Sequence, residues 1–184
     1  LSLLLIVMDN TSNWNNVFAN ELAAIRAAVS DLGETMNVGL MEQTQGGMDG
    51  GYVRFSIRSM TPTNRAALIG VIDEIIARGK NDSTEKANNP TYAQTMNEAW
   101  LYYKGGTPRT GLLDPKRDCG TSNSAYNPRG AALGSGYAYT SCASSGATYV
   151  SPFNATNSCQ RNFIIYVSNG PIANNDNGPG GDLL

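Results

Sequence analysis

Hydrophobic positions along the chain follow strand and helix periods in turn. Residues 3–8 are all apolar, which predicts a strand covered on both faces in the middle of a sheet. Apolar residues recur at helical spacing over residues 17–32, 61–78 and 90–104, and glycines follow each of these stretches. Residues 163–167 form a second continuous apolar run, which predicts another central strand. The chain therefore mixes central strands with amphipathic helices.

Two further strands are predicted between the first and second helices. Residues 37–42 form a short strand, and a glycine-rich turn at 46–51 makes residues 52–58 its antiparallel hairpin partner. Residues 52–58 alternate, which predicts a half-solvated edge strand with Val53, Phe55 and Ile57 on its inner face. The opposite set then faces water, where its charges discourage aggregation: Arg54, Ser56 and Arg58.

The order of the elements predicts an α/β fold: a doubly wound, mostly parallel sheet with one antiparallel edge strand. Right-handed crossovers make the first and last strands neighbours, so the polar loops that follow them, at 9–13 and 168–169, meet at one sheet edge. We predict the functional site there. Residues 107–160 lack sustained periodicity and are either a functional insertion or partly disordered. In the third helix, Tyr92, Trp100 and Tyr103 have the spacing of core and rim residues.

Oxygen-bearing side chains alternate directly after the first strand. Asp9, Thr11 and Asn13 could converge there on a hard cation. This spacing resembles the Asp-x-Ser-x-Ser loop of von Willebrand factor A domains, and with Trp14 it is more similar to the degenerate A-type domain of type IV pilus tip-associated adhesins, the PilY family.

A second stretch carries the same resemblance. The segment Cys159-Gln160-Arg161-Asn162 before the last strand looks like the Cys-Gln-Lys-Asn lead-in of the pilus tip adhesins. The resemblance covers most of residues 1–175. It implies a von Willebrand A-like domain over 1–175, with 107–160 as a loop-rich insertion and 176–184 as a flexible tail or the start of a missing remainder. The sheet would then end after its fourth strand.

The resemblance also implies a metal site, completed by Thr91 before the third helix and by Asn169, where the family has an aspartate. This site is degenerate, because Asp9 supplies its only carboxylate and ion affinity depends strongly on carboxylate number. We therefore expect no cofactor, or at most weak Ca²⁺ or Mg²⁺ binding. The favoured alternative is that Asp9, Thr11 and Asn13 cap the following helix and fix the loop.

Composition excludes several function classes. At 184 residues and 41% hydrophobic, the chain fits one domain with a sizeable core. A formal net charge of −2 and a charged fraction of 15% argue against a nucleic-acid partner. The absence of histidine removes Ser-His and Cys-His catalysis. No apolar stretch has the length of a transmembrane span, and no signal peptide is recognisable; because the chain starts inside a strand, we expect a processed or trimmed product.

All three cysteines, Cys119, Cys142 and Cys159, fall in the loop-rich second half. Their spacing does not fit a zinc site. In an oxidising compartment two of them would pair and one would be left over, although the sequence does not say which. The alternative is three buried free thiols.

The resemblance implies a module that acts by protein–protein contacts in adhesion or pilus assembly and not as an enzyme. It implies an extracellular location on the pilus, reached through the periplasm, with pilus subunits, other surface proteins or a host receptor as partners. A missing remainder or a neighbouring copy would donate further strands to the sheet. The rival hypotheses are a self-assembling fibre subunit and an α/β nucleotide- or small-ligand-binding domain, which would need a phosphate loop that the sequence lacks.

Overall fold

The computed structural model describes residues 2–11, 18–45, 48–79, 83, 85–87, 91–118, 148–153 and 159–168. Within them the fold is α/β, and the elements follow the predicted order. They are β1 (Ser2–Met8), α1 (Phe18–Asp31), β2 (Met36–Gln43), β3 (Gly51–Ser59), α2 (Pro62–Arg78), α3 (Tyr92–Lys104) and β4 (Arg161–Val167).

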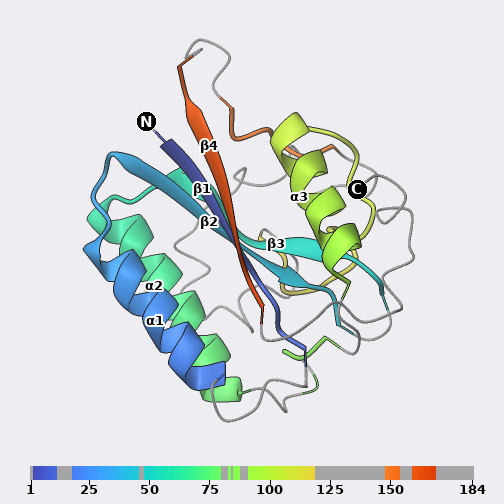
Figure 1. Cartoon of the computed structure of the whole chain (residues 1–184), viewed down its shortest axis with the longest axis horizontal. Coiled ribbons are helices and arrows are strands. Elements are labelled where there is room, and N and C mark those ends of the chain that lie inside the picture. Colours follow the sequence, from blue (N-terminus) through green and yellow to red (C-terminus); the bar gives the residue numbers. More distant parts are fainter. Residues whose placement is uncertain are drawn as a thin grey trace.

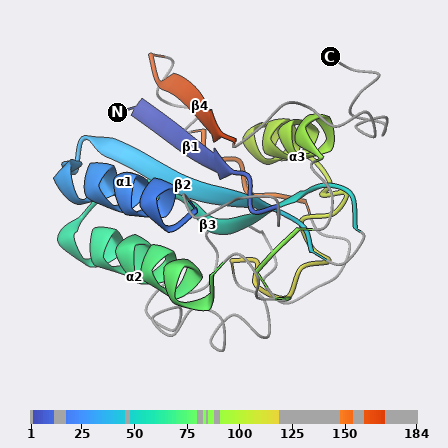
Figure 2. The ribbon, with the colours of Figure 1, turned by 60° about the horizontal axis from the view of Figure 1, so that its bottom comes forward.

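The four strands form one mixed sheet in the order β3-β2-β1-β4. Strand β1 pairs in parallel with β2 and with β4, and β3 pairs antiparallel with β2. The predicted adjacency of the first and last strands and the predicted antiparallel edge strand are thus both confirmed. Helices α1 and α2 cover one face of the sheet, and α3 lies on the other face (Figures 1 and 2).

Alternate residues of β1 divide the core between the two faces. Leu5 and Val7 pack in the cluster beneath α3, whereas Ile6 and Met8 pack in the cluster beneath α1 and α2. All four side chains are buried, as the unbroken apolar run of residues 3–8 predicts. This buried strand brings Asp9 to the carboxyl edge of the sheet.

The prediction that β3 has a solvated face is wrong. Arg54 and Ser56 are fully buried and Arg58 is only 6% exposed. Phe55 packs in the α1/α2 cluster, whereas Val53 and Ile57 pack in the α3 cluster. Two register shifts in the β2–β3 ladder break the regular alternation, so these three apolar residues do not share one face.

Gly39 of β2 lies at this irregularity. A Cβ atom at position 39 would meet Ile57 Cγ1 at 2.7 Å and the Phe55 carbonyl oxygen at 2.9 Å. Because the second contact is with backbone, it cannot be relieved by rotating a side chain. The absence of a side chain at Gly39 thus allows β3 to approach β2 where the ladder shifts.

A segment from the predicted insertion covers the outer edge of β3, and we call residues 107–118 the strap. The Asp118 N–H donates to the Val53 carbonyl at 2.8 Å, and the Ser56 N–H donates to Asp118 Oδ2 at 2.9 Å. Nearer the start of the strand, the Gly51 N–H donates to Thr110 Oγ1 at 3.1 Å. The strap is the second reason why the polar residues of β3 are buried.

Strand β4 is less covered than its sequence predicts. It lies at the edge of the described sheet, and Phe163, Ile164 and Ile165 are 48%, 37% and 51% exposed. On α3, Tyr103 is buried as expected, while Trp100 lies on the rim and is half exposed. No helix in the described ranges has both the length and the apolar character needed to cross a membrane.

Candidate functional site

Asp9 organises the carboxyl edge of the sheet, where the sequence predicts the site. Its side chain is fully buried. Oδ1 accepts the Thr11 N–H at 3.0 Å and the Thr11 hydroxyl at 2.6 Å. Oδ2 accepts the Tyr92 hydroxyl at 2.9 Å and the Ser168 hydroxyl at 3.2 Å. Both carboxylate oxygens are therefore engaged by the chain itself.

Strands β1 and β4 meet beside this carboxylate as predicted. The Asp9 N–H donates to the Val167 carbonyl at 2.9 Å, which places Ser168 next to Asp9. The Ser168 hydroxyl oxygen also lies within hydrogen-bond distance of the Tyr92 hydroxyl, at 2.9 Å. The last strand therefore contributes a serine hydroxyl to the polar cluster at this edge.

Thr91 is not a partner of Asp9. Its hydroxyl donates to the Gly50 carbonyl at 3.3 Å, and its N–H donates to Gln43 Oε1 at 3.3 Å. The neighbouring Tyr92 supplies the hydroxyl instead. Asn13 and Asn169, the other predicted metal-site residues, lie outside the described residues.

The chemistry of this cluster fits an anchor for the loop after β1. Hydroxyl and amide donors surround one carboxylate, and each of them stabilises its negative charge. Among the described residues, no group of histidine, cysteine, aspartate or glutamate has an arrangement that could hold a metal ion. Weak Ca²⁺ or Mg²⁺ binding that also uses Asn13 and Asn169 stays a prediction.

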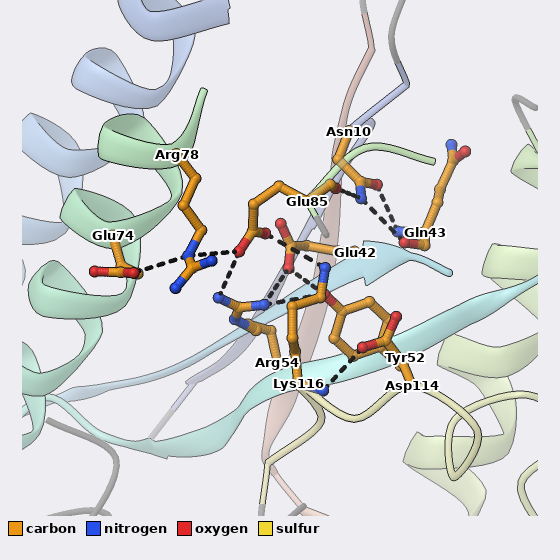
Figure 3. A network of polar contacts seen from close by, with 10 residues as sticks. All are labelled: Asn10, Glu42, Gln43, Tyr52, Arg54, Glu74, Arg78, Glu85, Asp114 and Lys116. Carbon is orange, nitrogen blue, oxygen red and sulfur yellow. Dashed lines mark hydrogen bonds and ion pairs between the residues drawn. The ribbon is translucent and has the colours of Figure 1, made fainter. Parts of the chain in front are cut away.

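A second cluster, buried beside the same edge, is a network of charges around Arg54 (Figure 3). The Arg54 guanidinium lies 3.5 Å from Glu42 Oε2 and 3.3 Å from Glu85 Oε1. Lys116 Nζ of the strap lies 3.4 Å from Glu85 Oε2, and Arg78 Nε of α2 lies 3.5 Å from Glu85 Oε1. Arg54, Glu42 and Lys116 are fully buried and Glu85 is 1% exposed. The network thus joins the sheet, α2, the connection after α2 and the strap.

Burial shifts the proton equilibria of this network. It raises the pKa of Glu85, and the nearby charge of Glu42 adds to this rise, while Arg54 and Lys116 oppose it. Burial works against the charged form of Arg54, but Tyr52, Glu42 and Glu85 outweigh it and raise its pKa, so the guanidinium stays charged. The Tyr52 hydroxyl donates to Glu42 Oε2 at 2.5 Å. Glu42 Oε1 is buried without a hydrogen-bond partner among the described residues.

The sequence gives little local signal for this network. Arg54 occupies a polar position of an alternating strand, which normally faces water. Glu85 lies in a polar connection, and Lys116 lies in a stretch without periodicity. These three residues meet only because the strap and the connection after α2 close over β3. The network is shielded from solvent, which fits a structural role better than contact with a substrate.

Glu98 of α3 fixes the beginning of the strap. Its carboxylate accepts the N–H groups of Arg109, Thr110 and Gly111 at 3.1 to 3.3 Å. The Tyr149 hydroxyl also donates to Glu98 Oε1 at 2.6 Å. Burial raises the pKa of Glu98, although each of these hydrogen bonds favours the ionised form.

The predicted disulfide is not decided by the described residues. Cys159 is exposed just before β4 and has no disulfide partner among them. Cys119 and Cys142 lie outside them. Pairing between two of the three cysteines therefore stays a prediction.

Comparisons with known proteins add no relative. No family model matches the chain, and neither the curated proteins nor the solved structures include a match. The residues and geometry of the chain itself therefore carry the functional argument.

We predict that Asp9 acts as an anchor. Asp9→Ala leaves the hydroxyl and N–H donors of Thr11 and Tyr92 without their acceptor, so the free energy of unfolding should fall by about 2–3 kcal/mol in urea denaturation. Calorimetric titration of both proteins with Ca²⁺ and Mg²⁺ tests the alternative. Saturable binding by the wild type that Asp9→Ala loses would contradict a purely anchoring role.

Arg54→Ala should be strongly destabilising. It leaves the carboxylates of Glu42 and Glu85 buried without their shared cation, so we expect the free energy of unfolding to fall by about 3–5 kcal/mol. The matched control is Arg26→Ala, since Arg26 pairs with Asp73 on the surface, with both side chains more than 40% exposed. Its loss should lower the free energy of unfolding far less, because solvent screens an exposed ion pair. If Arg54→Ala and Arg26→Ala lowered the free energy of unfolding equally in urea denaturation, the buried network would contribute no more to stability than a surface ion pair.

Glu98 should make part of the stability depend on pH. Because its folded pKa is raised, the folded chain binds this proton more tightly than the unfolded chain, whose pKa is near 4.5. The contribution of Glu98 to the free energy of unfolding therefore decreases as the pH rises from 4.5 through the raised folded value. Relative to Glu98→Gln, which does not titrate, the wild type should gain stability between neutral pH and pH 4.5. Parallel pH profiles of the two proteins in urea denaturation would refute this.

Proposed function

We propose that this chain is the A-type amino-terminal module of a type IV pilus tip-associated adhesin, which acts by protein–protein contacts and not by catalysis. The Asp9 loop and the Cys159-Gln160-Arg161-Asn162 lead-in support this proposal. The mixed α/β sheet, in which the first and last strands are parallel neighbours, is compatible with it. So is the use of Asp9 as a loop anchor at the position of a degenerate metal site.

An exposed apolar surface along β4 is the observation that carries the proposal. We call it the β4 rim and define it as Phe153, Phe163, Ile164 and Ile165, which are 37% to 51% exposed. Phe153 belongs to it because its ring lies 5.4 Å from that of Tyr103, whose hydroxyl donates to the Phe163 carbonyl at 3.1 Å. Exposed hydrophobic residues that cluster, unlike those scattered singly, mark contact surfaces. A sheet edge lined with them suits a protein partner.

The charge and composition of the chain narrow the partners. A formal net charge of −2 argues against nucleic acid as a partner. Pilus subunits, other surface proteins or a host receptor remain as the proposed partners, and the location is the cell surface, reached through the periplasm. Ca²⁺ or Mg²⁺ would have at most a weak supporting role at Asp9.

The proposal predicts that a charge in the β4 rim impairs surface function. In the organism that encodes the chain, Ile165→Lys in the parent protein should reduce adherence or the number of surface pili, because the charge cannot enter an apolar interface without cost. Leu113→Lys is the matched control, since Leu113 is 56% exposed on the strap at the opposite sheet edge. Immunoblots of surface protein establish equal amounts. Wild-type adherence and pili in Ile165→Lys would overturn the proposal.

A further inference from the structure

The strap contains the only Asp–Pro peptide bond of the sequence, between Asp114 and Pro115. A peptide bond to proline is a tertiary amide, and its nitrogen is a better leaving group than the nitrogen of an ordinary peptide bond. The aspartate before it carries a carboxyl group next to the carbonyl carbon of the same bond, so that attack on this carbon closes a small ring. The pair therefore holds both a nucleophile and a leaving group within the chain.

One oxygen of the Asp114 carboxyl group is buried without a partner. The Asp114 side chain is fully buried. Oδ1 accepts the Lys116 N–H at 2.9 Å (Figure 3). Oδ2 has no hydrogen-bond partner among the described residues, whereas buried polar atoms in proteins normally have one. Neither water nor a donor therefore lowers the reactivity of Oδ2, and it is available as a nucleophile.

Arg117 polarises the carbonyl group of the same bond. Its Nη1 donates to the Asp114 carbonyl oxygen at 2.9 Å, and its N–H donates to this oxygen at 3.3 Å. Two donors on one carbonyl oxygen stabilise the negative charge that develops there during nucleophilic attack, and the charged guanidinium is the stronger of the two. Pro115 and Arg117 are partly exposed, so water can reach the bond from outside.

The proton that the leaving nitrogen needs is supplied by the same carboxyl group. Burial raises the pKa of Asp114. The charges of Lys116 and Arg54 and the N–H groups of Lys116 and Gln45 oppose this rise, and Tyr52 lies beside the same carboxyl group. The folded chain thus keeps a proton on Asp114 at pH values at which an exposed aspartate has lost it.

We propose that the folded chain cleaves its own peptide bond between Asp114 and Pro115. Oδ2 of Asp114 attacks the Asp114 carbonyl carbon, the bond from this carbon to the Pro115 nitrogen breaks, and the nitrogen takes the proton that the carboxyl group loses. One water then opens the cyclic anhydride on Asp114. The products are a C-terminal Asp114 and an N-terminal Pro115, and one water is consumed. This activity goes beyond the proposed function and does not depend on it.

Contacts on both sides of the bond keep the two fragments in one fold. The first fragment carries Glu98, which holds the beginning of the strap. The second fragment keeps Lys116 beside Glu85, and it keeps the bond from the Asp118 N–H to the Val53 carbonyl. It also supplies β4, which pairs with β1. The cleaved protein should therefore remain one particle until it is denatured.

Incubation of the purified chain at mildly acidic pH, followed by denaturing electrophoresis and mass spectrometry, tests the proposal. We expect two fragments whose masses sum to the mass of the chain plus one water, the second beginning at Pro115. Sedimentation under native conditions should keep them together. Asp114→Asn retains an acceptor for the Lys116 N–H but lacks the carboxyl nucleophile, so it should remain intact.

Two further comparisons separate a built site from ordinary lability of an Asp–Pro bond. Arg117→Gln removes the charged donor and should slow cleavage by about a hundredfold. Arg109→Gln is the matched control, because Arg109 is an exposed arginine of the same strap, and it should keep the wild-type rate. The wild type unfolded in urea at the same pH should cleave at least about tenfold more slowly than the folded chain, because unfolding removes the fixed geometry.

Circular dichroism of each variant establishes that the fold is retained. A folded wild-type chain that stays intact would overturn the proposal. Fragments that form equally in Asp114→Asn would also overturn it and would indicate a contaminating protease. Equal rates in the folded and the unfolded wild type would show that the fold does not assist cleavage, which would overturn the assignment of a site at Asp114.

Discussion

The described fold depends most on the ion pairs that the buried guanidinium of Arg54 forms. It joins an acid of β2 to an acid of the connection after α2, and the second acid in turn holds Lys116 of the strap. Each of these charges is acceptable in the interior only because the others are present. The sheet, the end of α2 and the strap are therefore bound into one unit by charge balance in addition to apolar packing. Hydrophobic burial alone would not place the strap over β3 so specifically.

The sequence predicts the order of the elements and the adjacency of the first and last strands because these depend on local periodicity and on general rules of chain connection. It fails on β3 because burial of an edge strand depends on distant residues. The bond from Ser56 to Asp118 spans 62 positions, and no pattern within residues 52–58 contains that information. The ladder also shifts register twice, whereas an alternating sequence implies a regular ladder. The alternation of residues 52–58 therefore predicts wrongly that Arg54 faces water, because the alternation rule holds only for uncovered, regular strands.

The sequence predicts the location of the candidate site, but it does not predict which residues hydrogen-bond to Asp9 there. Asp9 follows a buried strand, so its place at the carboxyl edge follows from the fold class. The hydroxyl that reaches it comes from Tyr92 and not from Thr91, which is one position earlier. At the start of a helix, successive side chains point in directions that differ by more than a quarter of a turn. An error of one residue in the alignment therefore assigns the wrong side chain as the partner of Asp9. The aromatic ring of Tyr92 gave no signal for this polar role, since its helical spacing also fits a core residue.

Gly39 has no side chain, and the close approach of β3 to β2 at the register shift depends on this. The backbone of Phe55 and the side chain of Ile57 occupy the space in which a side chain at position 39 would lie. A larger residue there would separate the strands where the ladder changes register, and a slip of one position would move each side chain of β3 to the opposite face of the sheet. Arg54 would then lose its ion pairs with Glu42 and Glu85 and would lie among apolar side chains. The packing of β3 against β2 therefore requires glycine at position 39.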